Sequence, residues 1–453
     1  MAAYVRPRLR LVPQPWRSRA MQVLLALLFL TSPIVFVPAA LREEETDLWV
    51  RAGVSRSVVK EVLLPVSKSE YGPAAPSDTP SFCYALVSGQ GLFRATVSPQ
   101  ETAAAEKGTT IWGGAIWRPI DSDLPSKQWR NIQVQALAVD PSNPAVLYAG
   151  MGGTGSRNPA QSAGLYATSD GGQTWQTPVK SIAGQEVQAI AVMPHGQDRT
   201  AVAPASGAVS FPNPEEGVSA TRSGARSAYS VACAATSGGI YCNTGENQSW
   251  VRLDWRGIET RVLSLAIRPD NPGAIYVGTD GFGLEVTTDG GATWRQGSTD
   301  LRNRYVYDMV ISDSRPEMMY VATDGGVFES TDAGSTWILL DGPTKGRRVN
   351  AIALQDGTVA SGEAGTVLYV GLQYGAAYRY SPTSGEIVAD GDNKEDGDRL
   401  WSDSSGNWVP LKRGLGNLTI LSLALDPNDP TVLWAGTTDG VWRCALSSLQ
   451  QTR

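Results

Sequence analysis

The sequence predicts an all-β chain that folds as a seven-bladed β-propeller, with four antiparallel strands in each blade. A turn phrase with Asp, Gly and Trp at fixed positions occurs at 168–175, 287–294 and 330–337. Alternating apolar runs begin seven successive units of roughly forty residues or more, which is typical of propeller blades. The runs begin near Val58, Val134, Val187, Val262, Val306, Val349 and Ile420.

The repeated phrase has the chemistry of a tight turn. Its Asp carboxylate can accept hydrogen bonds from nearby backbone amides, its glycines supply positive φ angles, and its Trp leads into the next strand. We therefore expect a structural role for these residues. The three pairs are Asp170 with Trp175, Asp289 with Trp294, and Asp332 with Trp337. Two further copies, at 243–250 and 402–408, keep the Trp but are degraded or shortened.

The last unit ends after its third strand, because Cys444 is followed by a short polar tail without a Trp strand. An open sheet edge beside the first blade would favour aggregation. The stretch 46–51, just before the first unit, contains Trp49 in an apolar setting. We predict that this N-terminal strand closes the ring as the outer strand of blade seven.

The pattern resembles the Asp-box propellers, which include sialidases, xyloglucan-cleaving hydrolases, sortilin-type receptors and photosystem II assembly factors. The resemblance covers most of residues 47–446. It implies that the Asp turns lie at the blade periphery, between the third and fourth strands, away from any reaction centre. It implies a fold but not an activity, since one fold carries many functions.

The sequence before the propeller predicts export. Residues 1–20 carry five arginines and no acidic residue, and residues 21–41 are almost entirely apolar. This order places the N-terminus in the cytoplasm and the propeller, residues 42–446, outside it. One hydrophobic helix at 21–41 is expected, either as a membrane anchor or as a cleaved signal peptide. Residues 447–453 form a polar tail.

Four cysteines follow the apolar segment. Cys233 and Cys242 flank a Gly-containing hairpin turn, and a two-residue loop would set them opposite each other. A disulfide is then possible in an oxidising compartment, and two buried thiols are the alternative. Cys83 and Cys444 fall in the first and last blades, where a ring-closing bridge is the less favoured arrangement.

Catalytic and metal-binding patterns are sparse. His195 is the only histidine, so a histidine-based metal site or a Ser-His-Asp triad is not expected. An acidic run could bind calcium through its side-chain oxygens, although a solvated loop is the favoured interpretation. Its carboxylates are Asp390, Asp392, Asp396 and Asp398. We expect no cofactor, and the net charge of −6 argues against nucleic-acid binding.

Loop lengths divide the two faces of the predicted ring. Three insertions, at 67–81, 194–229 and 381–400, project from one face because strands alternate in direction. The opposite face has short loops, except at 151–163 in blade two, and carries the residues that precede the innermost strands. Those residues are Glu186, Arg261, Arg304, Tyr305, Arg347 and Arg348. A converging arginine cluster would bind carboxylates, phosphates or an acidic peptide. The alternative is that each arginine pairs with a neighbouring acid such as Asp280 or Asp324.

Three functions remain open at this stage. A non-catalytic, extracytoplasmic binding or assembly scaffold for a protein or anionic ligand is favoured, because no catalytic set is recognisable. A glycan-cleaving hydrolase would require two carboxylates facing each other across the central opening. The resemblance implies an arginine cluster and a Tyr-Glu pair in sialidases, whose typical arginine-containing strand motif is absent here. A photosystem assembly-type factor is a special case of the scaffold.

Overall fold

A computed structural model describes the chain in segments. They are residues 49–64, 81–97, 117–125, 133–141, 143–153, 163–176, 179–193, 231–243, 250–255, 260–301, 304–356, 365–374, 377–382, 401–403, 406–427 and 429–446. The chain divides into two units, 1–46 and 47–453, and every described residue lies in the second. The predicted hydrophobic segment 21–41 and the polar tail 447–453 lie outside these ranges. Among the described residues, no helix is long and apolar enough to cross a membrane.

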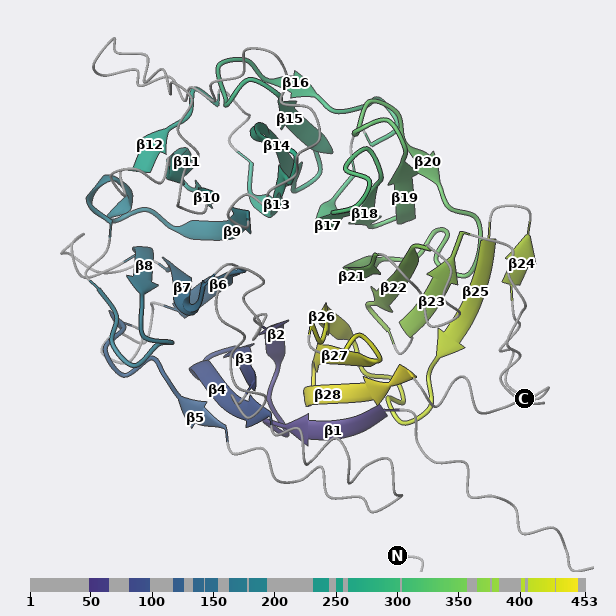
Figure 1. Ribbon diagram of the computed structural model, residues 1–453, viewed down its shortest axis with the longest axis horizontal. Coiled ribbons are helices and arrows are strands. Elements are labelled where there is room, and N and C mark those ends of the chain that lie inside the picture. The colour runs from purple at the N-terminus through teal and green to yellow at the C-terminus, as the bar shows by residue number, and fades with distance from the viewer. Residues whose placement is uncertain are drawn as a thin grey trace, which may run out of the picture. The chain divides into compact units, whose positions relative to one another are not determined.

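The second unit forms seven antiparallel sheets arranged around a common centre (Figure 1). These are the seven blades of a propeller. Blade one contains β2 (Val59–Leu63), β3 (Ser81–Val87), β4 (Gly91–Val97) and β5 (Arg118–Pro119). Blade two contains β6 (Gln133–Asp140), β7 (Asn143–Gly152) and β8 (Gly164–Thr168). Blade three follows the 3-10 turn η3 (Lys180–Ile182) and contains β9 (Val187–Met193), β10 (Val231–Thr236), β11 (Gly239–Asn243) and β12 (Trp250–Arg252).

The other four blades repeat this order from the centre outward. Blade four contains β13 (Val262–Arg268), β14 (Asn271–Thr279), β15 (Leu284–Thr287) and β16 (Arg295–Gln296). Blade five contains β17 (Val306–Ile311), β18 (Met319–Thr323), β19 (Gly326–Ser330) and β20 (Ile338–Leu339). Blade six contains β21 (Val349–Gln355), β22 (Val367–Leu372), β23 (Ala377–Ser381), β24 (Trp401–Asp403) and β25 (Gly406–Leu411). Blade seven contains β26 (Ile420–Leu425), β27 (Val432–Thr437), β28 (Gly440–Ala445) and β1 (Trp49–Gly53).

Blade seven takes its outer strand from the beginning of the described chain. The sheet order is β1-β28-β27-β26, and β1 pairs with β28 in antiparallel register, with Trp49 opposite Cys444. Trp49 is only 1% exposed. Its backbone N–H also bonds to the carbonyl of Arg413, in the chain that leads from blade six to blade seven. The strand therefore contacts two blades at once.

Two blades depart from four strands. In blade two, the chain after Trp175 follows β8 through backbone bonds from Gln176 to Ala167 and from Val179 to Leu165, without forming a regular fourth strand. In blade six, the prediction of a shortened Asp turn at 402–408 is wrong. These residues belong to the β24–β25 hairpin, which adds a fifth strand. In the register of this hairpin, Trp401 is paired with Trp408 and Asp403 with Gly406.

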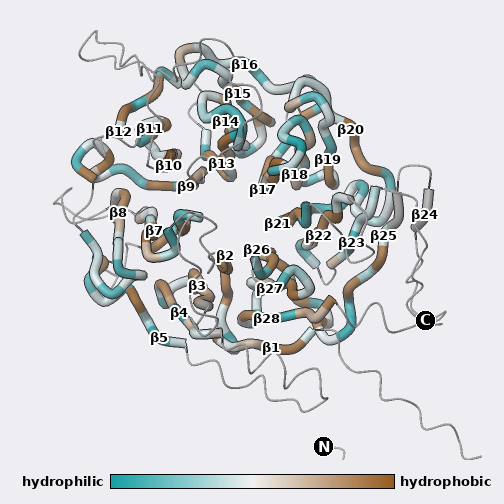
Figure 2. Tube along the Cα trace, in the orientation of Figure 1, coloured by the Kyte–Doolittle hydropathy of each residue, from teal (hydrophilic) through white to brown (hydrophobic). Residues whose placement is uncertain are grey.

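The hydrophobic core lies mainly between neighbouring blades. Seven buried clusters occur in the described part of the chain, and each combines residues of adjacent sheets. In one of them, Val59 and Cys83 of blade one pack with Trp434 of blade seven. The innermost strand of each blade contacts the innermost strands of the two neighbouring blades. Hydrophobic stretches run along strands such as β9 and β26 (Figure 2). Each blade is thus stabilised by both neighbours.

Tryptophan side chains connect the outer strands of four pairs of neighbouring blades. In each pair, the indole N–H of one blade donates to a backbone carbonyl of the preceding one. The bonds are Trp49 to Leu411 (2.9 Å), Trp117 to Ala52 (3.1 Å), Trp175 to Ile120 (2.7 Å) and Trp408 to Asp341 (2.9 Å). Each indole buries a large area and satisfies its single donor at the same time.

The cysteines of blade three form a disulfide. Cys233 of β10 lies directly opposite Cys242 of β11, with their Cα atoms 4.1 Å apart. The hairpin between them closes with Thr236 opposite Gly239, which leaves a two-residue loop. Cys83 and Cys444 are buried free thiols, so no bridge joins the first and last blades.

Candidate functional site

The candidate site lies on the face where the innermost strands begin. We call it the short-loop face; it also contains the turns between the second and third strands of each blade. Every innermost strand has a β-bulge directly inside this face, at its second residue in six blades and at its third residue, Gln135, in blade two. A bulge re-aims the side chains around it. In blade five the bulged residue is Tyr307, which turns an aromatic ring toward this face.

Arg304 is held within blade five. Its Nη1 atom lies 3.8 Å from Oδ1 of Asp324, and its guanidinium lies over the ring of Phe328, 5.8 Å from the centroid. Both partners of the ion pair are about one-third exposed, so water weakens their attraction. Gly325 leaves room for this approach, because a Cβ atom there would lie 2.5 Å from Nη1. The pairing with Asp324 corresponds to the structural alternative set out from the sequence.

Arg348 connects blade six to blade five through aromatic stacking. Its guanidinium lies over the ring of Tyr307, 4.0 Å from the centroid, and its Nε donates to Asn350 at 2.8 Å. Tyr307 stacks in turn on Tyr305, with centroids 6.1 Å apart and planes 17° apart. Burial raises the pKa of Tyr307, and the nearby charge of Arg348 opposes that rise. The three side chains form one continuous stack across the blade boundary.

Exposed aromatic side chains lie in the short loops of blades four, five and six. Phe282 and Tyr305 are each 41% exposed, and Tyr374 is 70% exposed. Arg347 donates from Nη2 to the backbone oxygen of Tyr374 at 3.3 Å, which ties the two loops of blade six together. We define the arginine–tyrosine surface as Phe282, Arg304, Tyr305, Tyr307, Arg347, Arg348 and Tyr374. It spans the short loops of blades four to six.

The remaining predicted site residues lie apart from this surface or at its edge. Arg261 precedes β13, and its carbonyl accepts the backbone N–H of Asp280 at 2.9 Å. Glu186 lies between blades two and three, where its Oε1 accepts a hydrogen bond from Gln135 at 2.6 Å. The arginines therefore do not all converge on one point. They are distributed along one side of the short-loop face and held there by aromatic rings, Asp324 and backbone carbonyls.

Phe282, Tyr307 and Tyr374 were not anticipated from the sequence. Phe282 lies between two glycines in a turn. A large apolar residue in such a turn could have been predicted from the sequence to be exposed. Tyr307 follows Val306 in an apolar run, where simple alternation gives no sign of a bulge. Its position therefore required the structure.

Polar side chains connect the innermost strands of all seven described blade pairs. Each one comes from the second or third residue of an innermost strand and reaches the next blade. The links are Glu61 to Leu137 N, Gln135 to Glu186, Gln188 to Val262 N, Ser264 to Val306 O, Asp308 to Ile352 N, Asn350 to Ile420 O and Ser422 to Val62 N. We call this set the inner seam links. Six of them bond to a backbone N–H or C=O of the neighbouring innermost strand, and Gln135 bonds to the side chain of Glu186.

Two of the inner seam links are carboxylates on opposite sides of the ring. Glu61 accepts from the N–H of Leu137 at 3.1 Å, and Asp308 accepts from the N–H of Ile352 at 2.9 Å. Burial raises the pKa of Glu61 to about 8, and the charge of Asp308 adds to that rise. Burial also raises the pKa of Asp308 to about 7. Both residues keep some solvent access, so dense surrounding protein rather than complete enclosure causes these shifts.

The repeated Asp turns have all the hydrogen bonds that a structural role requires. Asp170 accepts from the hydroxyls of Thr168 at 2.7 Å and Thr174 at 2.6 Å, and from the N–H of Thr174. Hydrogen bonds from Thr174 and Thr168 hold the pKa of Asp170 well below its usual range. Asp289 and Asp332 make the same set of contacts in blades four and five.

Within the described residues, no group of three or more His, Cys, Asp or Glu side chains is arranged to hold a metal ion. His195 and the calcium candidates Asp390, Asp392, Asp396 and Asp398 all lie outside the described ranges. The three long insertions of the opposite face lie almost entirely outside them too.

Comparison with known proteins identifies the fold. No family model and no curated protein matches the chain. Among solved structures, a GH74 enzyme of Niastella koreensis has a TM-score of 0.53 at 15% identity, covering 88% of this chain and 54% of its own. The extracellular domain of BT4673 from B. thetaiotaomicron has a TM-score of 0.51 at 13% identity, covering 88% and 40%. A YCF48 structure bound to a D1 peptide has a TM-score of 0.49 at 14% identity, covering 88% and 98%.

The two matches with TM-scores above 0.5 are consistent with a propeller fold. The chain spans only about half of the GH74 enzyme and less than half of the BT4673 extracellular domain. At these identities the likeness establishes the fold alone, so function has to be argued from the site.

Proposed function

We propose that the chain is an extracytoplasmic, non-catalytic propeller that binds an anionic segment of a partner protein on its short-loop face. The arginine–tyrosine surface is the observation that carries this proposal. Four of the five exposed large hydrophobic side chains in the described residues lie on this face, namely Val58, Phe282, Tyr305 and Tyr374. Tyrosine and arginine are the residue types that contribute most to binding at protein interfaces.

Charge favours an acidic partner. Next to the innermost strands of blades four to six, the short-loop face presents Arg261, Arg304, Arg347 and Arg348 against Asp280 and Asp324. The loops that lead in from the outer strands add Asp300 and the ion pair of Lys345 with Asp341. The charge next to these innermost strands is thus positive, although the net charge of the whole chain is −6. Planar guanidinium groups that are already positioned by stacking lose little side-chain entropy when they bind carboxylates. The surface is therefore partly preorganised for an acidic segment.

Location outside the cytoplasm is part of the same proposal. The buried Cys233–Cys242 disulfide suits an oxidising compartment, as does the arginine-rich stretch followed by an apolar run at the N-terminus. Whether residues 21–41 act as an anchor or as a cleaved peptide can be decided by measuring the mass of the protein purified from its host.

The test uses a short fluorescein-labelled peptide in which glutamate alternates with tyrosine. We expect wild-type protein to bind it and Arg348→Ala to weaken binding by about tenfold, because one charge and one stacking contact are lost. Arg118→Ala is the matched control, since Arg118 is an exposed arginine on the outer strand of blade one. If Arg304→Ala and Arg348→Ala lower the melting temperature but leave affinity unchanged, the arginines are structural and the proposal fails.

A glycan-cleaving hydrolase is the second candidate, and Glu61 with Asp308 is the observation that favours it. Carboxyl groups with raised pKa values are suited to general acid catalysis. Each of them, however, accepts a backbone N–H within a blade seam, which gives it a structural task. Hydrolysis of xyloglucan or sialyl-lactose that is lost in Glu61→Gln would favour this candidate. A photosystem assembly-type role is a narrower form of the scaffold, distinguished by whether the captured partner is a photosystem subunit.

A further inference from the structure

The connection that closes the ring presents three exposed side chains on the short-loop face. Residues 54–58 join β1, the outer strand of blade seven, to β2, the innermost strand of blade one (Figure 1). Arg56, Val58 and Lys60 are exposed, Val58 to 40%. We call these three residues the basic strip. Lys60 occupies the β-bulge of β2, at the short-loop end of that strand.

Hydrogen bonds from both neighbouring turns hold the backbone of the basic strip. The N–H of Arg56 donates to Oδ1 of Asp439 at 2.7 Å, from the turn between the second and third strands of blade seven. On the other side, the N–H of Ser88 in blade one donates to the carbonyl of Val58 at 2.9 Å. Both turns belong to the described part of the chain. The backbone of the strip is therefore preorganised, so that little of its entropy is lost when a ligand binds.

The turn that leads into the strip has a strained backbone. Val54 and Arg56 have φ angles of 47° and 60°, in the left-handed region that residues other than glycine rarely adopt, β-branched ones least of all. The N–H of Gly440 donates to the carbonyl of Ser57 at 2.8 Å and helps to hold this conformation. A Cβ atom on Gly440 would lie 2.8 Å from the carbonyl oxygen of Val54, so glycine permits the approach. Strained segments that their surroundings hold in place are concentrated at functional sites, including contacts with ligands.

The two basic side chains of the strip are available to a ligand. Within the part of the chain that the structure describes, neither the guanidinium group of Arg56 nor the ammonium group of Lys60 forms a hydrogen bond or an ion pair. The acids beside them are already engaged. Asp439 accepts from Arg51 and from the backbone of Arg56. Glu61 accepts a backbone N–H of blade two. The strip thus attracts carboxylates.

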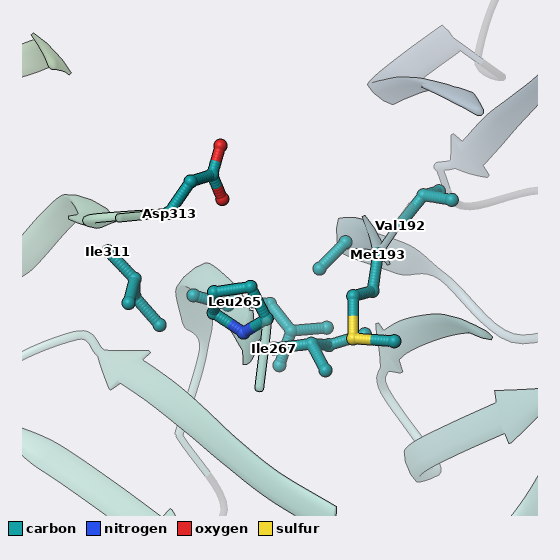
Figure 3. A pocket seen from close by; sticks show the side chains of 9 residues that line it. Val192, Met193, Leu265, Ile267, Ile311 and Asp313 are labelled. Atoms are coloured by element: carbon teal, nitrogen blue, oxygen red, sulfur yellow. The ribbon is translucent and has the colours of Figure 1, made fainter. Parts of the chain in front are cut away.

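The pocket described on the opposite face of the ring lacks such bases. The innermost strands of blades three, four and five line this apolar pocket, whose volume is about 240 Å³. Figure 3 shows Val192 and Met193 on one side of it and Ile311 with Asp313 on the other. Among the described residues that line it, none is basic, and Asp313 is acidic. Charge therefore favours the short-loop face as the place where an acidic segment binds.

We infer that the basic strip is a second contact for the acidic partner segment that binds the arginine–tyrosine surface. This inference rests on the function proposed for that surface. The strip lies on the same face, across the ring axis from blades four and five (Figure 1). A segment that binds both places crosses the axis, with carboxylates at Arg56 and Lys60 and an apolar side chain against Val58. The second contact raises the affinity because it forms within a complex that already exists.

The experiment titrates the protein with a sixteen-residue peptide in which glutamate alternates with tyrosine. Fully extended, this peptide reaches about 50 Å, which is enough to cross the ring axis. We expect one peptide to bind each protein molecule. Arg56→Ala combined with Lys60→Ala should weaken binding by about tenfold, because two ion pairs are lost, and added salt should reduce the difference. Lys60→Gln alone is a milder variant and should weaken binding several-fold.

The matched control is Arg118→Ala combined with Arg295→Ala. It removes the same charge from exposed positions on the outer strands of blades one and four, and it should change affinity by less than about twofold. Thermal melting verifies that each variant is folded.

Arg348→Ala separates this inference from the proposed function. If Arg348→Ala weakens binding and the folded strip variants do not, the strip is no contact, while the function proposed for the arginine–tyrosine surface stands. Two peptides bound per protein molecule, or an equal loss in the control, would also overturn the inference. Absence of binding to the wild-type protein would overturn both proposals.

Discussion

The outer rim and the inner rim of this propeller hold neighbouring blades together by different means. At the outer rim, indole rings such as Trp49 and Trp408 bury large surfaces and donate one hydrogen bond to the preceding blade. At the inner rim, small polar side chains such as Ser264 and Ser422 bridge the strands. Neighbouring blades are farther apart at the outer rim than near the axis of the ring. Bulky indole rings therefore fit between them at the outer rim, and short polar side chains fit at the inner rim. Stability should therefore depend more on the outer contacts.

Removal of β1 should give the largest effect. A protein lacking residues 42–54 loses the buried Trp49 ring and leaves β28 with an unpaired edge. We expect the melting temperature to fall by more than about 10 °C, or the protein to aggregate. The control is a protein that begins at residue 42. Equal melting temperatures would show that β1 is dispensable.

Loss of one outer-rim indole should have the next largest effect. Trp408 is 1% exposed, contacts Tyr380 with ring centroids 4.6 Å apart, and bonds to the carbonyl of Asp341. Trp408→Ala should lower the free energy of unfolding by about 3–5 kcal/mol, mainly through the cavity it creates. Urea denaturation measures this. Trp408→Phe keeps most of the apolar contact and should lose only about 1–2 kcal/mol.

The carboxylates of the inner rim should make stability depend on pH. The pKa of Glu61 is raised to about 8 in the folded protein, so between roughly pH 4.5 and pH 8 the folded state holds a proton that the unfolded state has released. Stability should therefore fall as pH rises through this window. The protonated carboxyl group can still accept from the N–H of Leu137 through its carbonyl oxygen.

Glu61→Gln removes this titration and should flatten the decline by about 1–2 kcal/mol, a value reduced for the solvent that reaches the side chain. Melting temperatures measured from pH 5 to pH 9 give the comparison. Asp308→Asn should remove a smaller part of the decline, over a window that ends near pH 7. Parallel curves for wild-type and both variants would mean that these carboxylates titrate alike in the folded and unfolded states.

Ser422→Ala should have the smallest effect. This change removes one inner seam link, the 3.0 Å bond to the N–H of Val62, and leaves the apolar packing in place. We expect a loss of about 1 kcal/mol in the free energy of unfolding, from the same urea titration used for Trp408→Ala. A loss as large as that of Trp408→Ala would mean that the contacts of the inner rim contribute as much to stability as those of the outer rim.

The arrangement of the blades was predictable because each blade corresponds to one copy of a sequence repeat. Innermost strands begin at Val59, Gln133, Val187, Val262, Val306, Val349 and Ile420, within one residue of the positions expected from the apolar runs. Seven blades of antiparallel strands are confirmed. The extra strand β24 was missed, because its pairing depends on a hairpin rather than on the repeat.

The candidate site was predictable only in part. Position in the repeat indicated which arginines lie on the short-loop face, since each precedes an innermost strand. It offered the pairing of Arg304 with Asp324 as one of two alternatives, and the structure contains that ion pair. It could not indicate that Arg348 would stack on Tyr307, because this contact joins different blades. The inner seam links could not be predicted from the sequence either. They use seven different residues at bulges that alternating patterns do not reveal.

The pairing of β1 with β28 also determines when the molecule can finish folding. During synthesis, Trp49 emerges early, whereas the carbonyl that accepts its indole N–H belongs to Leu411, 362 positions later. β1 therefore remains unpaired until the last blade has been synthesised. Such long-range contacts slow folding and prolong exposure of unpaired edges. A chain exported in sequence would complete its ring only after almost the whole of it had crossed, which makes the final step a natural point for chaperone assistance.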